Sequence, residues 1–295
     1  IAADQATKVC VSYHDIATFN IDVNCSFDAG ASFTQLGTAI DVAHAFLIDD
    51  NEIGNLAIDA NSHAMYQVFS GIANAAEAAL PTSFHAVWIG FSRDGGQSFS
   101  DHAVYVNPNT SVSYGHQFVN VSVDRAGTVY VVYTDDHNLF YSFSADGGST
   151  WTGPIQVNQA PSATAIMPWS VACDPGQLNI VWYGTSFFDG TTAPDNYPAS
   201  AAWYVFFAQN STATVAGSAF TQVAATPVIH FGGVCEGGIS CTGNRDLFDD
   251  FGIAVSPTTG QASITYSDDQ PGNVGRDDHT AIATQTAGPK ICTGA

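Results

Sequence analysis

Short apolar runs alternate with turns along most of this chain, and one pair of runs recurs five times. The first run of each pair ends in a turn, and nine or ten residues later a second, β-rich run ends in an aromatic residue. A repeated offset of this kind predicts repeated pairs of antiparallel strands. The turn residues are Asp4, Asp59, Asp124, Asp174 and Ser256, and the aromatic residues are Tyr13, Phe69, Tyr133, Tyr183 and Tyr266.

A third strand such as HAVWIGF and a fourth such as WTGPIQV follow in the clearest repeats. Between them stands a turn with one frame, read as SFDAGASF from residue 26, SRDGGQSF from residue 92 and SADGGSTW from residue 144. Asp bonds nearby backbone amides in such turns, and Gly supplies the unusual dihedral angles. Strand, turn, strand, loop, strand, turn, strand is the order of a propeller blade.

The sequence therefore predicts an all-β protein: a β-propeller of four-stranded antiparallel blades with five visible units, in a five- or six-bladed ring. We expect one domain over 1–295, with inner strands that include 53–58, 118–123, 168–173 and 251–255. Both end units are incomplete, which leaves open ring closure by the termini or self-assembly through the end blades. The segment IANAAEAAL at 72–80 has the period of a short helix inserted in a loop.

The three turns around Asp28, Asp94 and Asp146 resemble the Asp boxes of the sialidase-like BNR-repeat β-propellers. The segments MPWSVACDPGQLNIVWYGT and NRDLFDDFGIAVSPTTGQASITYSDD also resemble secreted bacterial and archaeal proteins of that group. The resemblance implies a sialidase-like propeller with its Asp boxes on one face. It does not imply one activity, because enzymes, lectins and adhesion proteins share these turns.

Charge narrows the range of partners. The 295 residues carry 27 Asp plus Glu against 6 Lys plus Arg, for a net charge of −21. Such a field repels nucleic acid and anionic membranes. No apolar run approaches the roughly 18 residues of a membrane span. We expect an exported protein, secreted or at the cell surface, whose partner is an extracellular glycan or another surface protein.

Six cysteines allow three disulfides, which also suits an exported chain. Cys235 and Cys241 are close enough in sequence to close a small loop, and Cys10 and Cys25 lie on neighbouring predicted strands. These two pairs are the predicted disulfides.

Strand direction places the Asp boxes on one face of the blades and a different set of loops on the opposite, upper face. The carboxylates of these upper loops predict a site for a hard cation, most naturally Ca²⁺, which accepts six to eight oxygen ligands. Solvated acids without a metal are the alternative. The predicted ligands are Asp49, Asp50, Glu52, Asp135, Asp136, Asp249, Asp250, Asp268 and Asp269.

Authentic sialidase activity is disfavoured by the arginines. The resemblance would require three arginines around the substrate carboxylate, but Arg93 and Arg125 fall in lower turns, which leaves Arg245 and Arg276. A different glycosidase would need two carboxylates across a sugar, and Glu52 with Asp249 or Asp250 is the predicted pair. The predicted ligand-binding residues are Trp169, Tyr114, His116 and Gln117, with interblade packing as the alternative for Trp169.

Two functions remain. The first is a non-catalytic binding or structural surface protein that is metal-stabilised and binds glycans. The alternative is a glycoside hydrolase of the sialidase-like superfamily that acts on extracellular glycans, with Glu52, Asp249, Asp250, Arg245 and Arg276 in its active site. The sequence favours the first, and we expect no organic cofactor for either.

Overall fold

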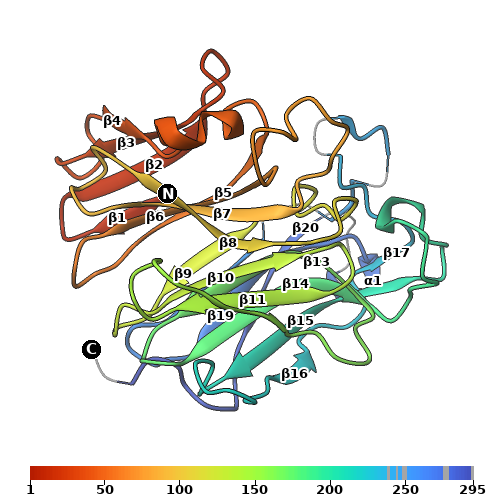
Figure 1. Ribbon diagram of the computed structural model, residues 1–295. Helices are drawn as coiled ribbons and strands as arrows, with labels where there is room; N and C mark the ends of the chain where they lie inside the picture. Colours follow the sequence, from red (N-terminus) through yellow and green to blue (C-terminus); the bar gives the residue numbers. More distant parts are fainter. Residues whose placement is uncertain (238–239, 244, 248–250, 275–278, 294–295) are drawn as a thin grey trace. The chain divides into compact units, whose positions relative to one another are not determined.

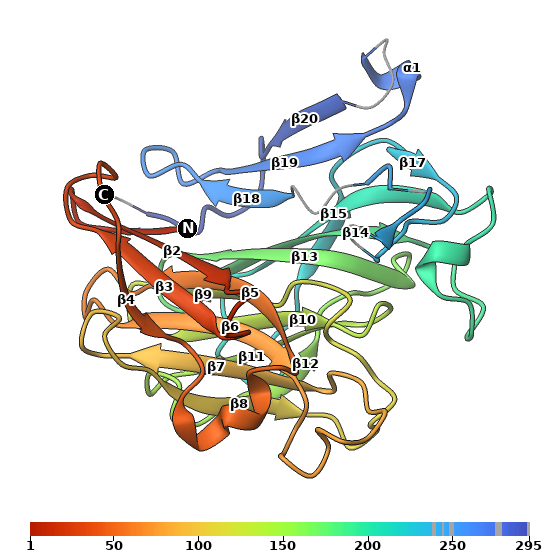
Figure 2. The same ribbon diagram turned by 90° about the horizontal axis from the view of Figure 1, so that it is seen from above.

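The computed structural model describes residues 1–237, 240–243, 245–247, 251–274 and 279–293. Within these ranges the chain forms antiparallel sheets, together with two 3-10 helices and one α-helical turn. The fold is a five-bladed β-propeller, and each sheet is made of consecutive strands of the chain (Figures 1 and 2). No described helix has the length and apolar composition needed to cross a membrane.

The chain divides into two compact units, which are described separately below. Unit 1 comprises 1–133 and 141–154, and unit 2 comprises 134–140 and 155–295. The expectation of a single domain over 1–295 stays a prediction.

Unit 1 begins with two four-stranded sheets, each in simple meander order. Their buried side chains form one core that includes Cys10, Val23, Leu47 and Phe69. The 3-10 helix η1 (Val42–Leu47) connects the two sheets. The strands of these sheets are β1 (Ala2–Asp4), β2 (Lys8–His14), β3 (Ile21–Ser26), β4 (Thr34–Thr38), β5 (Asn51–Ile58), β6 (Met65–Gly71), β7 (Ala86–Ser92) and β8 (Ser100–Val106).

The third sheet has the most regular blade pattern, in the order β12-β11-β10-β9. Its second strand is buried at every position, because VYVVYT packs both faces against neighbouring side chains. Asn55 on β5 donates to the carbonyl of Val121 on β9 and accepts from its amide, at 3.0 and 2.6 Å, so a side chain links two inner strands of unit 1. The strands are β9 (Asn120–Val123), β10 (Val129–Thr134), β11 (Leu139–Ser144) and β12 (Thr152–Gln156).

Unit 2 holds the fourth and fifth sheets around a second core that includes Val181, Trp203 and Ile264. In the part of the chain that the structure describes, the fifth sheet has three strands, as the incomplete last repeat predicts, and β20 is its edge. The elements are β13 (Thr164–Ala172), β14 (Leu178–Thr185), η2 (Pro194–Asn196), β15 (Ala202–Asn210), β16 (Thr221–Ala224), β17 (His230–Phe231), β18 (Gly252–Val255), β19 (Ala262–Asp268), α1 (Pro271–Val274) and β20 (His279–Thr284).

The predicted inner strands are confirmed, since 53–58, 118–123, 168–173 and 251–255 overlap β5, β9, β13 and β18. The predicted helix at 72–80 is wrong, because this segment forms turns rather than a helix. Glu77 explains the difference: its carboxylate accepts from the amide of Ala73 at 2.8 Å and binds His85 Nε2 at 3.0 Å. These side-chain contacts stabilise turns in place of a regular helix.

Three turns share one hydrogen-bonding geometry, and each lies between the third and fourth strands of its sheet. In the turn of Asp146, Ser144 Oγ donates to Oδ1 at 2.7 Å, and Thr150 donates through its amide at 2.9 Å and its hydroxyl at 2.7 Å. Asp28 and Asp94 accept from Ser26, Ser32, Ser92 and Ser98 in the same way. These bonds lower the pKa of all three carboxyls to about 2.

The lowered pKa values predict a loss of stability in acid. A carboxyl with a folded pKa near 2 and an ordinary unfolded pKa near 4 stabilises the fold above pH 4, and this contribution disappears as the pH falls through 2. We expect Asp146→Asn to lower the melting temperature by a few degrees at pH 7 and to differ less from the parent at pH 2. Thermal melts across this range test it, with exposed Asp49→Asn as the control. A constant difference at every pH would contradict the assignment.

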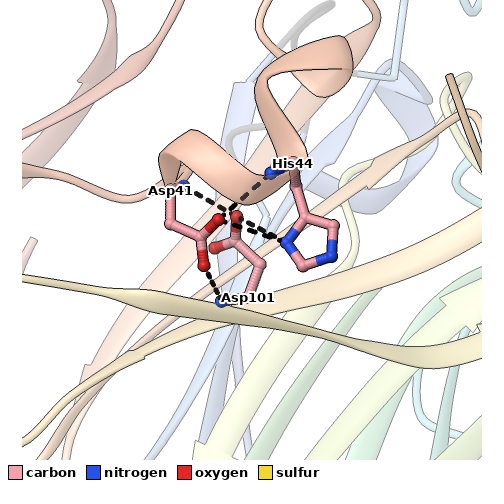
Figure 3. A group of neighbouring side chains, drawn as sticks. All are labelled: Asp41, His44 and Asp101. Atoms are coloured by element: carbon pink, nitrogen blue, oxygen red, sulfur yellow. Dashed lines mark hydrogen bonds and ion pairs between the residues drawn. The ribbon is translucent and has the colours of Figure 1, made fainter.

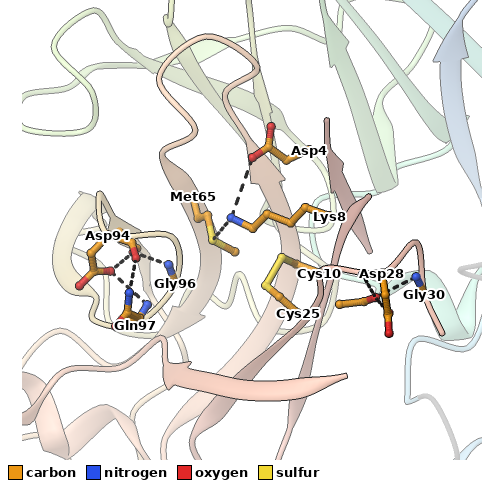
Figure 4. Close-up of a disulfide and its surroundings, with 12 residues drawn as sticks. Asp4, Lys8, Cys10, Cys25, Asp28, Gly30, Met65, Asp94, Gly96 and Gln97 are labelled. Atoms are coloured by element: carbon orange, nitrogen blue, oxygen red, sulfur yellow. Dashed lines mark hydrogen bonds and ion pairs between the residues drawn. A yellow bond between two sulfur atoms is a disulfide. The ribbon is translucent and has the colours of Figure 1, made fainter. Parts of the chain in front are cut away.

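The structure contains three disulfides and no free cysteine. Both predicted pairs are confirmed, and Figure 4 shows Cys10–Cys25 between the turns of Asp28 and Asp94 in this view. The third bond joins Cys173, just after β13, to Cys292 in the C-terminal tail. The tail is also held where the Asp174 amide donates to the carbonyl of Ile291 at 2.8 Å.

Candidate functional site

The upper end of each sheet is the end at which its first strand begins and its second strand ends. Because the strands alternate in direction, the turns of Asp28, Asp94 and Asp146 lie at the opposite, lower end. In unit 2 the upper loops follow β10, β14, β17 and β19. Loops of this kind carry most functional side chains in rigid β folds.

Two carboxylates from distant parts of the sequence meet at the upper end of unit 2. A carboxylate oxygen of Asp136, after β10, lies within 4.8 Å of one of Glu236, after β17. The backbone holds both residues: the Asp136 amide donates to Thr134 Oγ1 at 3.1 Å, and the Glu236 amide donates to Asp195 Oδ1 at 2.9 Å. Both residues are half-buried, so the pair is enclosed but still reached by solvent.

Aromatic side chains flank this pair. The ring of His137 stacks on that of Phe188 with centroids 3.9 Å apart, and Phe188 remains 39% exposed. Burial lowers the pKa of His137 even though Asp135, Asp136 and Asp189 act against it. The ring is therefore held neutral more readily than a free histidine. An exposed aromatic face beside carboxylates is the usual setting for a sugar ring.

Tyr197 places a buried side chain next to this region. Its hydroxyl lies 2.6 Å from Thr164 Oγ1 and 3.4 Å from His137 Nδ1. Its pKa is raised to about 12, mainly by burial; the hydrogen bond with Thr164 opposes this rise, and the charges of Glu236, Asp189 and Asp136 add to it. The tyrosine thus stays protonated at neutral pH and is available as a hydrogen-bond donor.

A second cluster lies at the upper ends of the fifth sheet and β17. His230 Nδ1 is 2.6 Å from Asp269 Oδ2, and Asp246 brings a carboxylate oxygen within 4.8 Å of both. Asp268 is buried and accepts from the Gln270 amide at 2.9 Å. Asp269 therefore lies beside His230, and Asp268 lies 3.8 Å from His279 Nε2. Both aspartates are predicted metal ligands, and the sequence analysis included neither histidine. Calcium binding there stays a prediction.

Of the remaining predicted metal ligands, Asp135 fills a turn role, since it accepts from the amides of His137 and Asn138 at 3.2 and 2.7 Å. In unit 1, Asp49, Asp50 and Glu52 stand together at the start of β5. Burial raises the pKa of Glu52 and of Asp50, while the charge of His14 lowers that of Glu52. Glu52 is therefore a carboxyl that holds its proton longer than usual.

The predicted ligand-binding residues differ in exposure, and their role in binding stays a prediction. Tyr114 is 1% exposed, receives a hydrogen bond from Asn107 Nδ2 at 2.9 Å and packs edge-on against Tyr133. Gln117 is buried and His116 is exposed. Trp169 is half-buried against the unit 2 core, which favours the packing alternative.

Asp249, Asp250 and Arg276 lie outside the described residues, so their predicted roles stay predictions. Arg245 is half-buried next to Asp246 in the chain. Sequence analysis did not identify Glu236 as a site residue, since it stands in a glycine-rich stretch, CEGGISC, with no motif around it. Its rarity was the available signal: the chain has three glutamates, at 52, 77 and 236.

No protein-family model matches the sequence, and no curated protein matches it either. Solved structures do share the fold at low identity. An α-L-arabinofuranosidase from Fusarium graminearum, in complex with an iminosugar inhibitor, is 10% identical with a TM-score of 0.52, over 94% of this chain and 89% of that one. The likeness shows the fold alone.

Two other solved structures share the same fold. An α-L-arabinanase from Penicillium chrysogenum complexed with arabinobiose is 10% identical with a TM-score of 0.50, over 94% of this chain and 89% of that one. A leech intramolecular trans-sialidase is 11% identical with a TM-score of 0.51, over 90% of this chain and 36% of that one.

Proposed function

We propose that this protein is a glycoside hydrolase whose catalytic carboxylates are Asp136 and Glu236. The observation that carries the proposal is the approach of their carboxylate oxygens to within 4.8 Å, with His137, next to Asp136 in the chain, stacked on the exposed ring of Phe188. This replaces the predicted pair of Glu52 with Asp249 or Asp250 by one that lies wholly in unit 2. It also favours hydrolysis, the alternative in the sequence analysis, over a purely binding role.

The distance between the carboxylates supports a retaining mechanism. Retaining glycosidases hold their two carboxyl groups about 5–5.5 Å apart, whereas inverting enzymes leave roughly 6.5–9.5 Å for a water molecule. In the retaining reaction one group, as the carboxylate, attacks the anomeric carbon, while the other, as the carboxylic acid, protonates the departing glycosidic oxygen and becomes a carboxylate. Water then attacks the glycosyl ester, and the second carboxylate takes up its proton, which restores both groups.

Charge supports a neutral substrate. A chain with a net charge of −21 and four arginines repels a sialic acid carboxylate more strongly than it can bind it. Among the proteins of similar fold, the Penicillium arabinanase is complexed with arabinobiose, a neutral sugar. Neutral pentose or hexose glycans outside the cell are therefore the proposed substrates.

The stacking ring gives a prediction about substrate affinity. Phe188→Ala should raise KM about 3- to 10-fold with little change in kcat, because aromatic stacking contributes roughly 0.5–1.5 kcal/mol and acts on bound substrate and transition state alike. Steady-state kinetics on one oligosaccharide test this. Phe231→Ala is the control, since Phe231 is 48% exposed on β17. An equal change in both variants would remove the stacking role.

Hydrolysis of a glycan panel tests the proposed function. Arabinan, galactan and a sialoside are incubated with the protein, and released sugars are separated by chromatography. We expect turnover of a neutral glycan and none of the sialoside. Binding of a glycan by calorimetry without any product would instead support the non-catalytic reading.

A further inference from the structure

A histidine and two aspartates converge in unit 1, and none of them belongs to the proposed active site. Asp41 precedes η1, His44 lies within it, and Asp101 is the second residue of β8. Figure 3 shows the two carboxylates side by side with the His44 ring facing them. One nitrogen and two carboxylate oxygens of these residues lie within 4.8 Å of one another.

The backbone fixes the two carboxylates against each other. The Asp41 amide donates to Asp101 Oδ2 at 2.8 Å, and the Asp101 amide donates to Asp41 Oδ2 at 3.1 Å. Asp41 Oδ1 also accepts from the amides of Ala43 and His44, at 2.8 and 3.1 Å, as the N-cap of η1. The carboxylates are therefore held in place without help from any ligand.

Two polar atoms of the cluster have no hydrogen-bond partner among the described residues. The Asp101 side chain is fully buried, and its Oδ1 has no hydrogen-bond partner among the described residues. His44 Nδ1 likewise makes no hydrogen bond of good geometry within the described chain, although it faces both carboxylates.

The spacing fits a small tetrahedral cation. His44 Nδ1 lies 3.3 Å from Asp41 Oδ1 and 3.7 Å from Asp101 Oδ2. Zn²⁺ holds His nitrogen and Asp oxygen at about 2.0–2.2 Å, and the edge of a tetrahedron is about 1.6 times the bond length, so its ligands stand about 3.2–3.5 Å apart. The first separation lies in this range, and the second exceeds it by about 0.2 Å.

Ligand chemistry points the same way. An imidazole nitrogen suits Zn²⁺, whereas Ca²⁺ and Mg²⁺ prefer an all-oxygen shell. Asp41 and His44 side chains keep 21% and 28% of their surface exposed, which leaves an entry route and room for a solvent ligand. We propose that Asp41, His44 and Asp101 bind one divalent transition-metal ion of the Zn²⁺ type, with solvent as the fourth ligand.

This ion would join the segment after the first sheet to the outer strand of the second. Because η1 connects these sheets, the metal would act as a clamp that secures the connection. The clamp shares no residue with the proposed active site, so its function does not depend on the proposed hydrolysis.

Metal titration tests the proposal without any glycan. Chelator-treated, dialysed protein is titrated with Zn²⁺ by calorimetry in 0.15 M salt, which screens loose binding to the acidic surface. We expect one ion per chain, and at least about 10-fold weaker binding in both His44→Gln and Asp101→Asn. His102→Gln is the control, because His102 is the next residue of β8 but packs its ring on Phe91.

Co²⁺ absorption and thermal melts complete the test. Co²⁺ should give the intense visible bands of a four-coordinate site in the parent and in His102→Gln, and lose them in His44→Gln. The melting temperature should rise with Zn²⁺ in the parent and in His102→Gln but not in His44→Gln or Asp101→Asn, while Asp101→Asn stays folded because Asn preserves the shape of the side chain. Absence of stoichiometric binding, or binding that both ligand variants retain, would overturn the proposal.

Discussion

Glu236→Gln should lower kcat on a neutral oligosaccharide by about 10²–10⁴-fold, and Asp136→Asn should do the same. Each substitution preserves the shape of the side chain but removes a group that must exchange a proton or form a bond at the anomeric carbon. Because the two carboxylates act in one reaction, the double variant should be little worse than either single variant.

The control for this pair is Asp189→Asn. Asp189 is an exposed carboxylate of the same region, but it serves a turn, where it accepts from the amides of Thr191 and Thr192 at 3.0 and 2.8 Å. Its loss should leave kcat within about 2-fold of the parent. An aryl glycoside with a good leaving group then distinguishes the acid from the nucleophile. Its leaving group departs without a proton, so the variant that lacks the acid still forms the glycosyl-enzyme, whereas the variant that lacks the nucleophile does not.

Removal of the Cys173–Cys292 disulfide should cost the largest single loss of stability, about 5 kcal/mol of unfolding free energy. The bond closes a loop of 119 residues, and the entropy lost by the unfolded chain grows with the logarithm of loop length. The double Cys173→Ser, Cys292→Ser variant, measured by urea unfolding, tests this value.

The small disulfide provides the comparison. Cys235 and Cys241 are separated by 6 residues, so their removal should cost about 2 kcal/mol on the same reasoning. Equal losses from the two double variants would show that loop length is not the source of the stabilisation.

The blade pattern could be predicted from the sequence because its determinants are local. The turn of Asp146 spans seven residues, from Ser144 to Thr150, and the side-chain bonds to its carboxylate lie in that segment. The alternation of apolar residues likewise fixes strands such as VYVVYT without reference to distant contacts.

The candidate site could not be predicted in the same way because it is built from long-range contacts. Asp136 and Glu236 are a hundred positions apart, and the loop that carries Glu236 is placed by the pairing of β17 with the start of β15. The sequence indicated the upper loops, and Glu52 was a predicted catalytic carboxylate among them. Glu52 lies in unit 1, where burial raises its pKa. The disulfide between Cys173 and Cys292 was not predicted either, because its two cysteines are 119 positions apart in the sequence.

A covalent trap tests the central claim most directly. A retaining enzyme that is given a 2-deoxy-2-fluoro glycoside with a good leaving group accumulates its glycosyl-enzyme, which mass spectrometry can locate. The account predicts one added sugar per chain on the peptide that contains Asp136 or Glu236, and none after substitution of that residue. Turnover of a neutral glycan with no adduct, or an adduct on any other carboxylate, would contradict it.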